Sequence, residues 1–166
     1  MANKQSFTAD EWNKILESVA LSGVAVTAAD PSGLLGMFKE SFASASAVIS
    51  AKQDPGANEL VKAVVADFES SEGRSKLRES LKKTLAGSNQ SDVANRCLES
   101  LRQVSGILDS KAPNDAAAFK TWLRAISSRV ADAASEGGFA GIGGTKVSDK
   151  EKATLSDISK ALGIAA

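Results

Sequence analysis

The chain has 166 residues, with 20 basic and 20 acidic side chains, one Cys and no His. This length predicts a single domain over residues 1–166, with a core large enough to need no disulfide or structural metal. The lone Cys97 excludes a disulfide within the chain, and with no His it also excludes the ordinary zinc sites. The lack of His excludes catalysis by a Ser-His-Asp or Cys-His arrangement. The formal charge of zero argues against nucleic-acid binding.

Apolar residues recur at helical spacing along nearly the whole chain, and no segment keeps the two-residue alternation of a strand. The first predicted helix begins at a capping box of Thr8 and Glu11, in which the hydroxyl and the carboxylate each accept a backbone N–H. It ends at Asp30, because a proline follows. Residues 34–49 carry the apolar stripe of a second helix, and residues 60–68 that of a third.

The second half of the chain predicts four more helices. Residues 70–73 are interpreted as a turn, after which a short basic helix carries Leu77, Leu81 and Leu85 on one face. Longer helices are predicted over about residues 91–110 and over the segment that follows Pro113. A last helix begins at a second capping box, Ser148 with Glu151, and stops at Gly163.

These elements predict an all-α fold, a compact bundle of about seven helices in one domain. Residues 1–7 and 164–166 are expected to fray, because nothing in their sequence ties them down. The segment 136–147 is a glycine-rich loop. Its glycines lack the spacing of a phosphate-binding loop and no strand precedes them, so we expect Phe139 and Ile142 to pin it to the bundle.

Two further features admit both a structural and a functional interpretation. Cys97 lies on the inward stripe of its helix and is expected to behave as a small core hydrophobe, with redox sensing or capture of a soft ion as the alternative. The short fourth helix is rich in basic side chains, which form a solvated face or a surface for an acidic partner. These side chains are Arg74, Lys76, Arg78, Lys82 and Lys83.

Acidic residues near helix ends form a candidate metal site. Asp30 and Glu40 flank the turn after the first helix, while Glu136, Asp149 and Glu151 flank the turn before the last one. If the two turns pack together, their carboxylates could converge on a hard divalent cation, which takes oxygen ligands. The alternative is that these residues only cap and terminate helices.

This arrangement of two turns resembles the TerB-type helical domains that are associated with tellurite resistance and other bacterial stress systems. The matching segments are residues 28–30 with Glu40, and residues 147–151 with Leu155 and Ile158. The chain departs from the family pattern where Pro31 follows Asp30 in place of a glycine, and where the glycine-rich loop lengthens the second turn. The resemblance implies a metal-binding helical stress protein without established catalysis.

The sequence therefore predicts a soluble binding protein of bacterial cytoplasm, with a protein partner or a second copy of itself as the occupant of its surface. No apolar run approaches the length of a membrane span, and residues 1–7 lack the order of a signal peptide. Two alternatives remain open. One is an enzyme that uses the carboxylates named above with a divalent cation, and the other is a purely structural or oligomerising module.

Overall fold

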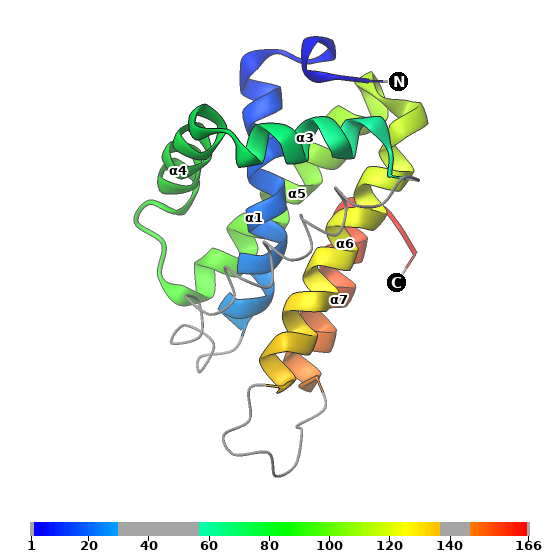
Figure 1. The fold of residues 1–166 in the computed structure, drawn as a ribbon. Helices are drawn as coiled ribbons and strands as arrows, with labels where there is room; N and C mark the ends of the chain where they lie inside the picture. The colour runs from blue at the N-terminus through cyan, green and yellow to red at the C-terminus, as the bar shows by residue number, and fades with distance from the viewer. Residues whose placement is uncertain (1, 30–56, 137–146, 166) are drawn as a thin grey trace.

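The chain is all-helical in the computed structural model, which describes residues 2–29, 57–136 and 147–165 (Figure 1). Within these ranges a short 3-10 helix and six α-helices follow one another: η1 Lys4–Ser6, α1 Ala9–Ala29, α3 Glu59–Glu69, α4 Ser71–Leu85, α5 Gln90–Lys111, α6 Pro113–Glu136 and α7 Asp149–Leu162. The predicted helical bundle is confirmed for this part of the chain. The helix expected over residues 34–49, and the docking expected for Phe139 and Ile142, lie outside it.

Helix α1 is the centre of the bundle and contacts each of the other five α-helices. Between Ile15 and Ala29 it carries a single charged residue, Glu17, and a helix that is apolar on nearly every face must be covered on nearly every face. In Figure 1, α3 crosses α1 while α6 and α7 run side by side. Buried residues of all six helices join in one hydrophobic cluster.

The predicted caps are present at both ends of the chain. Thr8 N–H donates to Glu11 Oε2 at 2.7 Å and Glu11 N–H donates to Thr8 Oγ1 at 3.3 Å, which closes the capping box of α1. Ser148 and Glu151 close the same motif at α7. Gly163 ends α7 with φ +68°, a left-handed conformation that glycine adopts without strain.

Serine hydroxyls join pairs of helices inside the bundle. Ser127 Oγ of α6 donates to the carbonyl of Ser22 in α1 at 2.9 Å, and both serines are fully buried. Ser105 Oγ of α5 donates to the carbonyl of Leu162 near the end of α7 at 3.0 Å. A small hydroxyl side chain lets two helices approach closely while its own polar atom stays satisfied. The serine content of the chain thus contributes to interhelical packing.

The corner between α3 and α4 is tighter than the predicted turn over residues 70–73. Only Ser70 separates the two helices, and its hydroxyl accepts the N–H of Gly73 at 2.8 Å while donating to the carbonyl of Asp67 at 2.8 Å. One residue therefore ends α3 and caps α4. A Cβ atom built on Gly73 would lie 1.9 Å from the carbonyl oxygen of Asp67, so the corner requires glycine at this position.

Residues 2–7 are docked on the bundle, which differs from the fraying expected at this end of the chain. Ala2 and Phe7 are both 8% exposed, and the N–H of Ala2 donates to Asp115 Oδ2 in α6 at 2.7 Å. At the other end, Ile164 packs against the hydrophobic core. The expectation of fraying considered only how close a residue lies to an end of the chain. It could not include such contacts, because their partners are remote in sequence.

Candidate functional site

Of the five residues in the predicted metal site, the structure describes the side chains of two, Asp149 and Glu151. Asp30 and Glu40 lie outside the described residues, as does the side chain of Glu136, whose backbone ends α6. Asp149 is fully exposed and pairs with Lys152 at 3.5 Å. Glu151 is 6% exposed and its Oε2 accepts the N–H of Ser148 at 2.7 Å, so it serves as a cap.

No group of three or more Cys, Asp or Glu side chains that could hold a metal ion occurs in the described part of the chain. Among the candidate ligands, only Asp149 and Glu151 can be placed with their side chains, and each is already engaged within α7. The proposed ligand set and its divalent cation therefore remain a prediction from the sequence.

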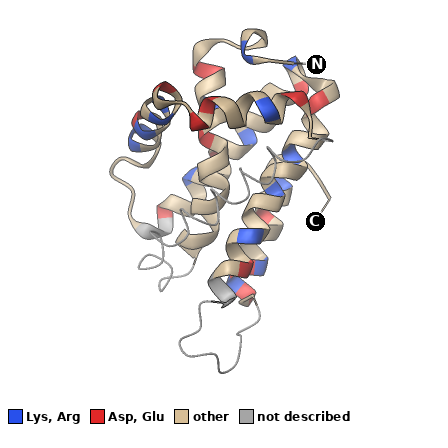
Figure 2. Ribbon diagram, viewed as in Figure 1, with Lys and Arg blue, Asp and Glu red and all other residues tan. Residues whose placement is uncertain are grey.

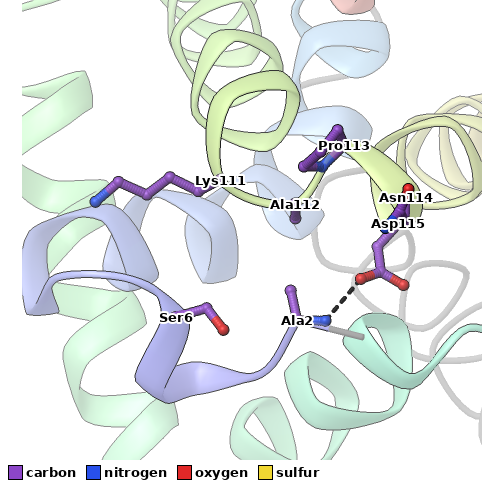
Figure 3. A pocket seen from close by; sticks show the side chains of 7 residues that line it. All are labelled: Ala2, Ser6, Lys111, Ala112, Pro113, Asn114 and Asp115. Carbon is purple, nitrogen blue, oxygen red and sulfur yellow. Dashed lines mark hydrogen bonds between the residues drawn. The ribbon is translucent and has the colours of Figure 1, made fainter.

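A polar cavity of about 170 Å³ lies where α5 meets α6 (Figure 3). Three of the polar side chains that line it already have partners. Asp115 accepts from the N–H of Ala2 at Oδ2 and from Asn58 Nδ2 at Oδ1, each at 2.7 Å. Lys111 Nζ bonds Glu11 at 2.8 Å, and the hydroxyl of Ser6 accepts the N–H of Asn3. The cavity thus offers a ligand few uncommitted groups, and we assign it a structural role.

Helix α4 differs from the rest of the bundle in its charge and in its slight burial. It carries five basic and two acidic side chains, and Figure 2 shows the Lys and Arg segments following one another along it. Only Gly73 and Leu77 are buried, while Leu81 and Leu85 are partly buried against the core. The helix therefore presents most of its surface to solvent.

The basic residues of α4 fall into two groups. Lys76 and Lys83 are paired with glutamates one turn earlier, at 2.6 Å to Glu72 and 3.1 Å to Glu79. The hydrogen bond and the charge of Lys76 hold the pKa of the Glu72 carboxyl below its usual range. These pairs neutralise one flank of the helix.

Arg74, Arg78 and Lys82 form the other group, which we name the basic ridge. They recur every four residues, so they follow one line along the surface of α4, and all three are exposed. Arg74 donates to the carbonyl of Glu69, and no described carboxylate pairs with any of the three. Within the described part of the chain, the ridge is thus a line of three positive charges that no carboxylate neutralises.

Beneath α4 lies a buried carboxylate. Glu17 of α1 is 2% exposed, and its Oε2 accepts the hydroxyl hydrogen of Ser80 in α4 at 2.7 Å. No described residue donates to its Oε1, although that atom is buried. Burying a carboxylate with one of its oxygens unpaired costs free energy. This desolvation cost opposes the packing of α4 on α1.

Cys97 of α5 carries a free thiol, and this residue is fully buried. Burial raises the pKa of the Cys97 thiol to about 12, and the negative charge of Glu17 adds to the rise. The expected core position of Cys97 is confirmed. In the folded protein the buried thiol is therefore protonated at neutral pH.

The sequence indicated the basic helix but not the buried carboxylate. One feature of the sequence could have drawn attention to Glu17: it is the only charged residue between Ile15 and Ala29. A lone acid in an uncharged helical run points either to solvent or into the core, and the choice depends on which helices cover it. Ser80 and Cys97 come from two other helices, so their convergence on Glu17 is a tertiary property.

No protein-family model, curated protein or solved structure matches the chain. The TerB-type resemblance therefore stays a prediction. None of the described helices is long and apolar enough to span a membrane.

Proposed function

We propose that this is a binding protein whose basic ridge on α4 recognises an acidic segment of a partner protein. The observation that carries the proposal is the line of Arg74, Arg78 and Lys82, exposed at four-residue spacing with no described carboxylate to neutralise it. Like charges at this spacing destabilise a free helix by a few tenths of a kcal/mol per pair. An acidic partner would relieve that repulsion.

The rest of α4 favours a peptide over a polyphosphate or a lipid surface. Glu72 and Glu79 remain on the helix and would repel a continuous row of phosphates. Leu81 and Leu85, only partly buried, border the ridge and offer apolar contact to an amphipathic segment. A partner that combines acidic and apolar side chains therefore fits this surface best.

The test uses a fluorescent amphipathic peptide built from Glu and Leu at helical spacing, with binding followed by anisotropy. The parent protein is expected to bind, and more weakly as salt rises, because exposed charges are screened within roughly 10 Å at 0.1 M salt. The double variant Arg78→Glu/Lys82→Glu should lose binding. Lys152→Glu/Lys160→Glu makes the same charge change on exposed residues of α7 and should retain it.

Three results would contradict the proposal. The parent protein does not bind the peptide, the α4 and α7 double variants lose binding equally, or a single-stranded oligonucleotide of the same net charge binds more tightly than the peptide. The last result would indicate a nucleic-acid surface.

A further inference from the structure

We propose that the seam between α6 and α7 is a binding site for the carboxylate of a small molecule, with the guanidinium of Arg124 and the hydroxyl of Ser128 as its donors. The inference goes beyond the acidic-partner proposal and does not depend on it, because both residues belong to α6 and not to α4. It stands on the way Arg124 is held, on the donors that remain uncommitted and on the charge of the site.

Arg124 is held by neutral hydroxyl groups from both helices. Its Nε–H donates to Ser159 Oγ of α7 at 2.8 Å, and an Nη1–H donates to Ser128 Oγ one turn further along α6. Ser159 is fully buried, and its own hydroxyl donates to the carbonyl of Leu155 at 3.1 Å. The two helices run side by side (Figure 1). Because bonds to both helices fix the plane of the guanidinium, its remaining donors have a defined direction.

The remaining donors of this cluster have no described acceptor. A guanidinium carries five N–H donors. The two bonds to serine leave the other N–H groups of Arg124 uncommitted among the described residues. Ser128 accepts from Arg124, and no described residue accepts the hydrogen of its hydroxyl. Donors that surround one cation without an acceptor suit a group that only accepts hydrogen bonds, and an ionised carboxylate is such a group.

The charge of the site also favours a carboxylate. Arg124 is partly buried, pairs with no described carboxylate, and burial lowers the pKa of its guanidinium. Lys120, one turn earlier in α6, is 5% exposed, but its Nζ bonds both oxygens of Asp109 at 2.6 and 2.7 Å. Arg124 therefore supplies a single uncompensated positive charge in the described part of α6–α7. A carboxylate balances this charge, whereas a phosphate dianion would leave a negative charge in a partly desolvated place.

The experiment titrates the ¹⁵N-labelled full chain with sodium acetate at neutral pH and fixed ionic strength. Nuclear magnetic resonance follows the Nε–Hε signal of Arg124 and the backbone amides of residues 128 and 159. We expect saturable shifts of these signals with a midpoint in the millimolar range, because a small ligand gains one bidentate ion pair and few other contacts. Sodium phosphate, titrated in the same way, should bind more weakly.

Four variants test the donors. Arg124→Gln removes the cation and should abolish saturable binding, as followed by the backbone amides. Arg124→Lys keeps the charge but loses the planar fork, and should bind about tenfold more weakly. Ser128→Ala removes the uncommitted hydroxyl and should weaken binding several-fold. Arg102→Gln is the control, because Arg102 lies exposed on α5 and pairs with Glu99 at 3.2 Å, and it should bind within about twofold of the parent.

Four results would overturn the proposal. The parent shows no saturable shift, Arg124→Lys and Ser128→Ala bind as tightly as the parent, Arg102→Gln loses as much affinity as Arg124→Gln, or phosphate binds more tightly than acetate. The α4 variant Arg78→Glu/Lys82→Glu should retain acetate binding, so failure of the acidic-partner proposal is distinguishable from failure of this one.

Discussion

The two tryptophans of the chain lie on apolar stripes of their helices but have different surroundings. Trp12 is 2% exposed, and its Nε1–H donates to Asp67 Oδ2 at 2.6 Å. Trp122 is only partly buried and packs edge-on against Phe119, with ring centroids 5.3 Å apart. Its Nε1–H has no acceptor in the described part of the chain. Helical periodicity does not distinguish these two environments.

Replacing Trp12 by Phe should therefore cost more than replacing Trp122 by Phe. The first change removes a hydrogen bond to a carboxylate, worth about 1.5 to 3 kcal/mol, whereas the second removes a donor that has no described acceptor. Urea denaturation at neutral pH measures both. Equal losses in the two variants would show that the Asp67 bond contributes little.

The excess cost of Trp12→Phe should disappear in acid. Burial raises the pKa of the Asp67 carboxyl, but hydrogen bonds from Trp12 and Lys4 outweigh it, so the net pKa lies below its usual value of 3.8. A lowered folded-state pKa stabilises the protein above pH 3.8, and this contribution is lost as the pH falls through the folded-state pKa.

The thiol of Cys97 should give the free energy of unfolding the opposite pH dependence. Its thiol pKa of about 12 in the folded protein lies above the ordinary value of 9.0, so its stabilisation is complete below pH 9.0 and lost as the pH rises toward 12. The free energy of unfolding should fall by up to about 1.4 kcal/mol per pH unit in this range. Chemical denaturation of the parent and of Cys97→Ser, compared at several alkaline pH values, isolates the effect. Parallel curves would contradict it.

At the scale of the element, helix ends follow from local chemistry while helix corners do not. The capping boxes at Thr8 and Ser148 and the stop at Gly163 are confirmed, because each motif satisfies backbone groups within one turn. The α3–α4 corner was predicted as a longer turn. Gly73 suggested a break, but the structure uses its missing Cβ to bring α4 against the carbonyl of Asp67.

Two glycine-to-alanine changes test this difference. Gly73→Ala should destabilise the protein by about 1 to 3 kcal/mol or more, because its Cβ would lie 1.9 Å from the Asp67 carbonyl oxygen. Gly106→Ala, in the exposed interior of α5 with nothing within 4 Å, should stabilise it by about 0.5 to 1 kcal/mol. Thermal or urea unfolding gives the signs. A neutral Gly73→Ala would show that the corner can relax.

At the scale of the whole molecule, Asp115 connects three distant parts of the chain. Its two oxygens accept from the N–H of Ala2, ahead of η1, and from the side chain of Asn58, the N-cap of α3. Asp115 itself lies in the first turn of α6 and is 5% exposed. One acid thus holds the N-terminal segment and α3 against α6.

Asp115→Asn should consequently destabilise more than one element. The new amide places an NH₂ against one of two existing donors, so one hydrogen bond is replaced by a repulsive contact, at a cost of about 2 to 4 kcal/mol. Hydrogen exchange should increase in both residues 2–7 and the first turn of α3. Asp149→Asn changes a fully exposed acid and serves as the control, with a change within about 0.5 kcal/mol. Exchange confined to one of the two segments would refute the linkage.

The sequence by itself determined the helical class, most helix limits within the described ranges, the burial of Cys97 and the charge of α4. Each of these depends on residues within a few turns of one another, through periodicity, caps and composition. The predicted metal site requires the turn after the first helix and the turn before the last helix to lie side by side. The sequence does not indicate the distance between these two turns.

Tertiary structure alone decided what surrounds Glu17. Its partner Ser80 lies 63 residues away, and the thiol of Cys97 belongs to a third helix. The same contacts determine that α4 exposes Arg74, Arg78 and Lys82 and covers a carboxylate with an unpaired oxygen. Such properties arise from the spatial arrangement of the helices, because a group loses its contact with water only when several elements pack around it.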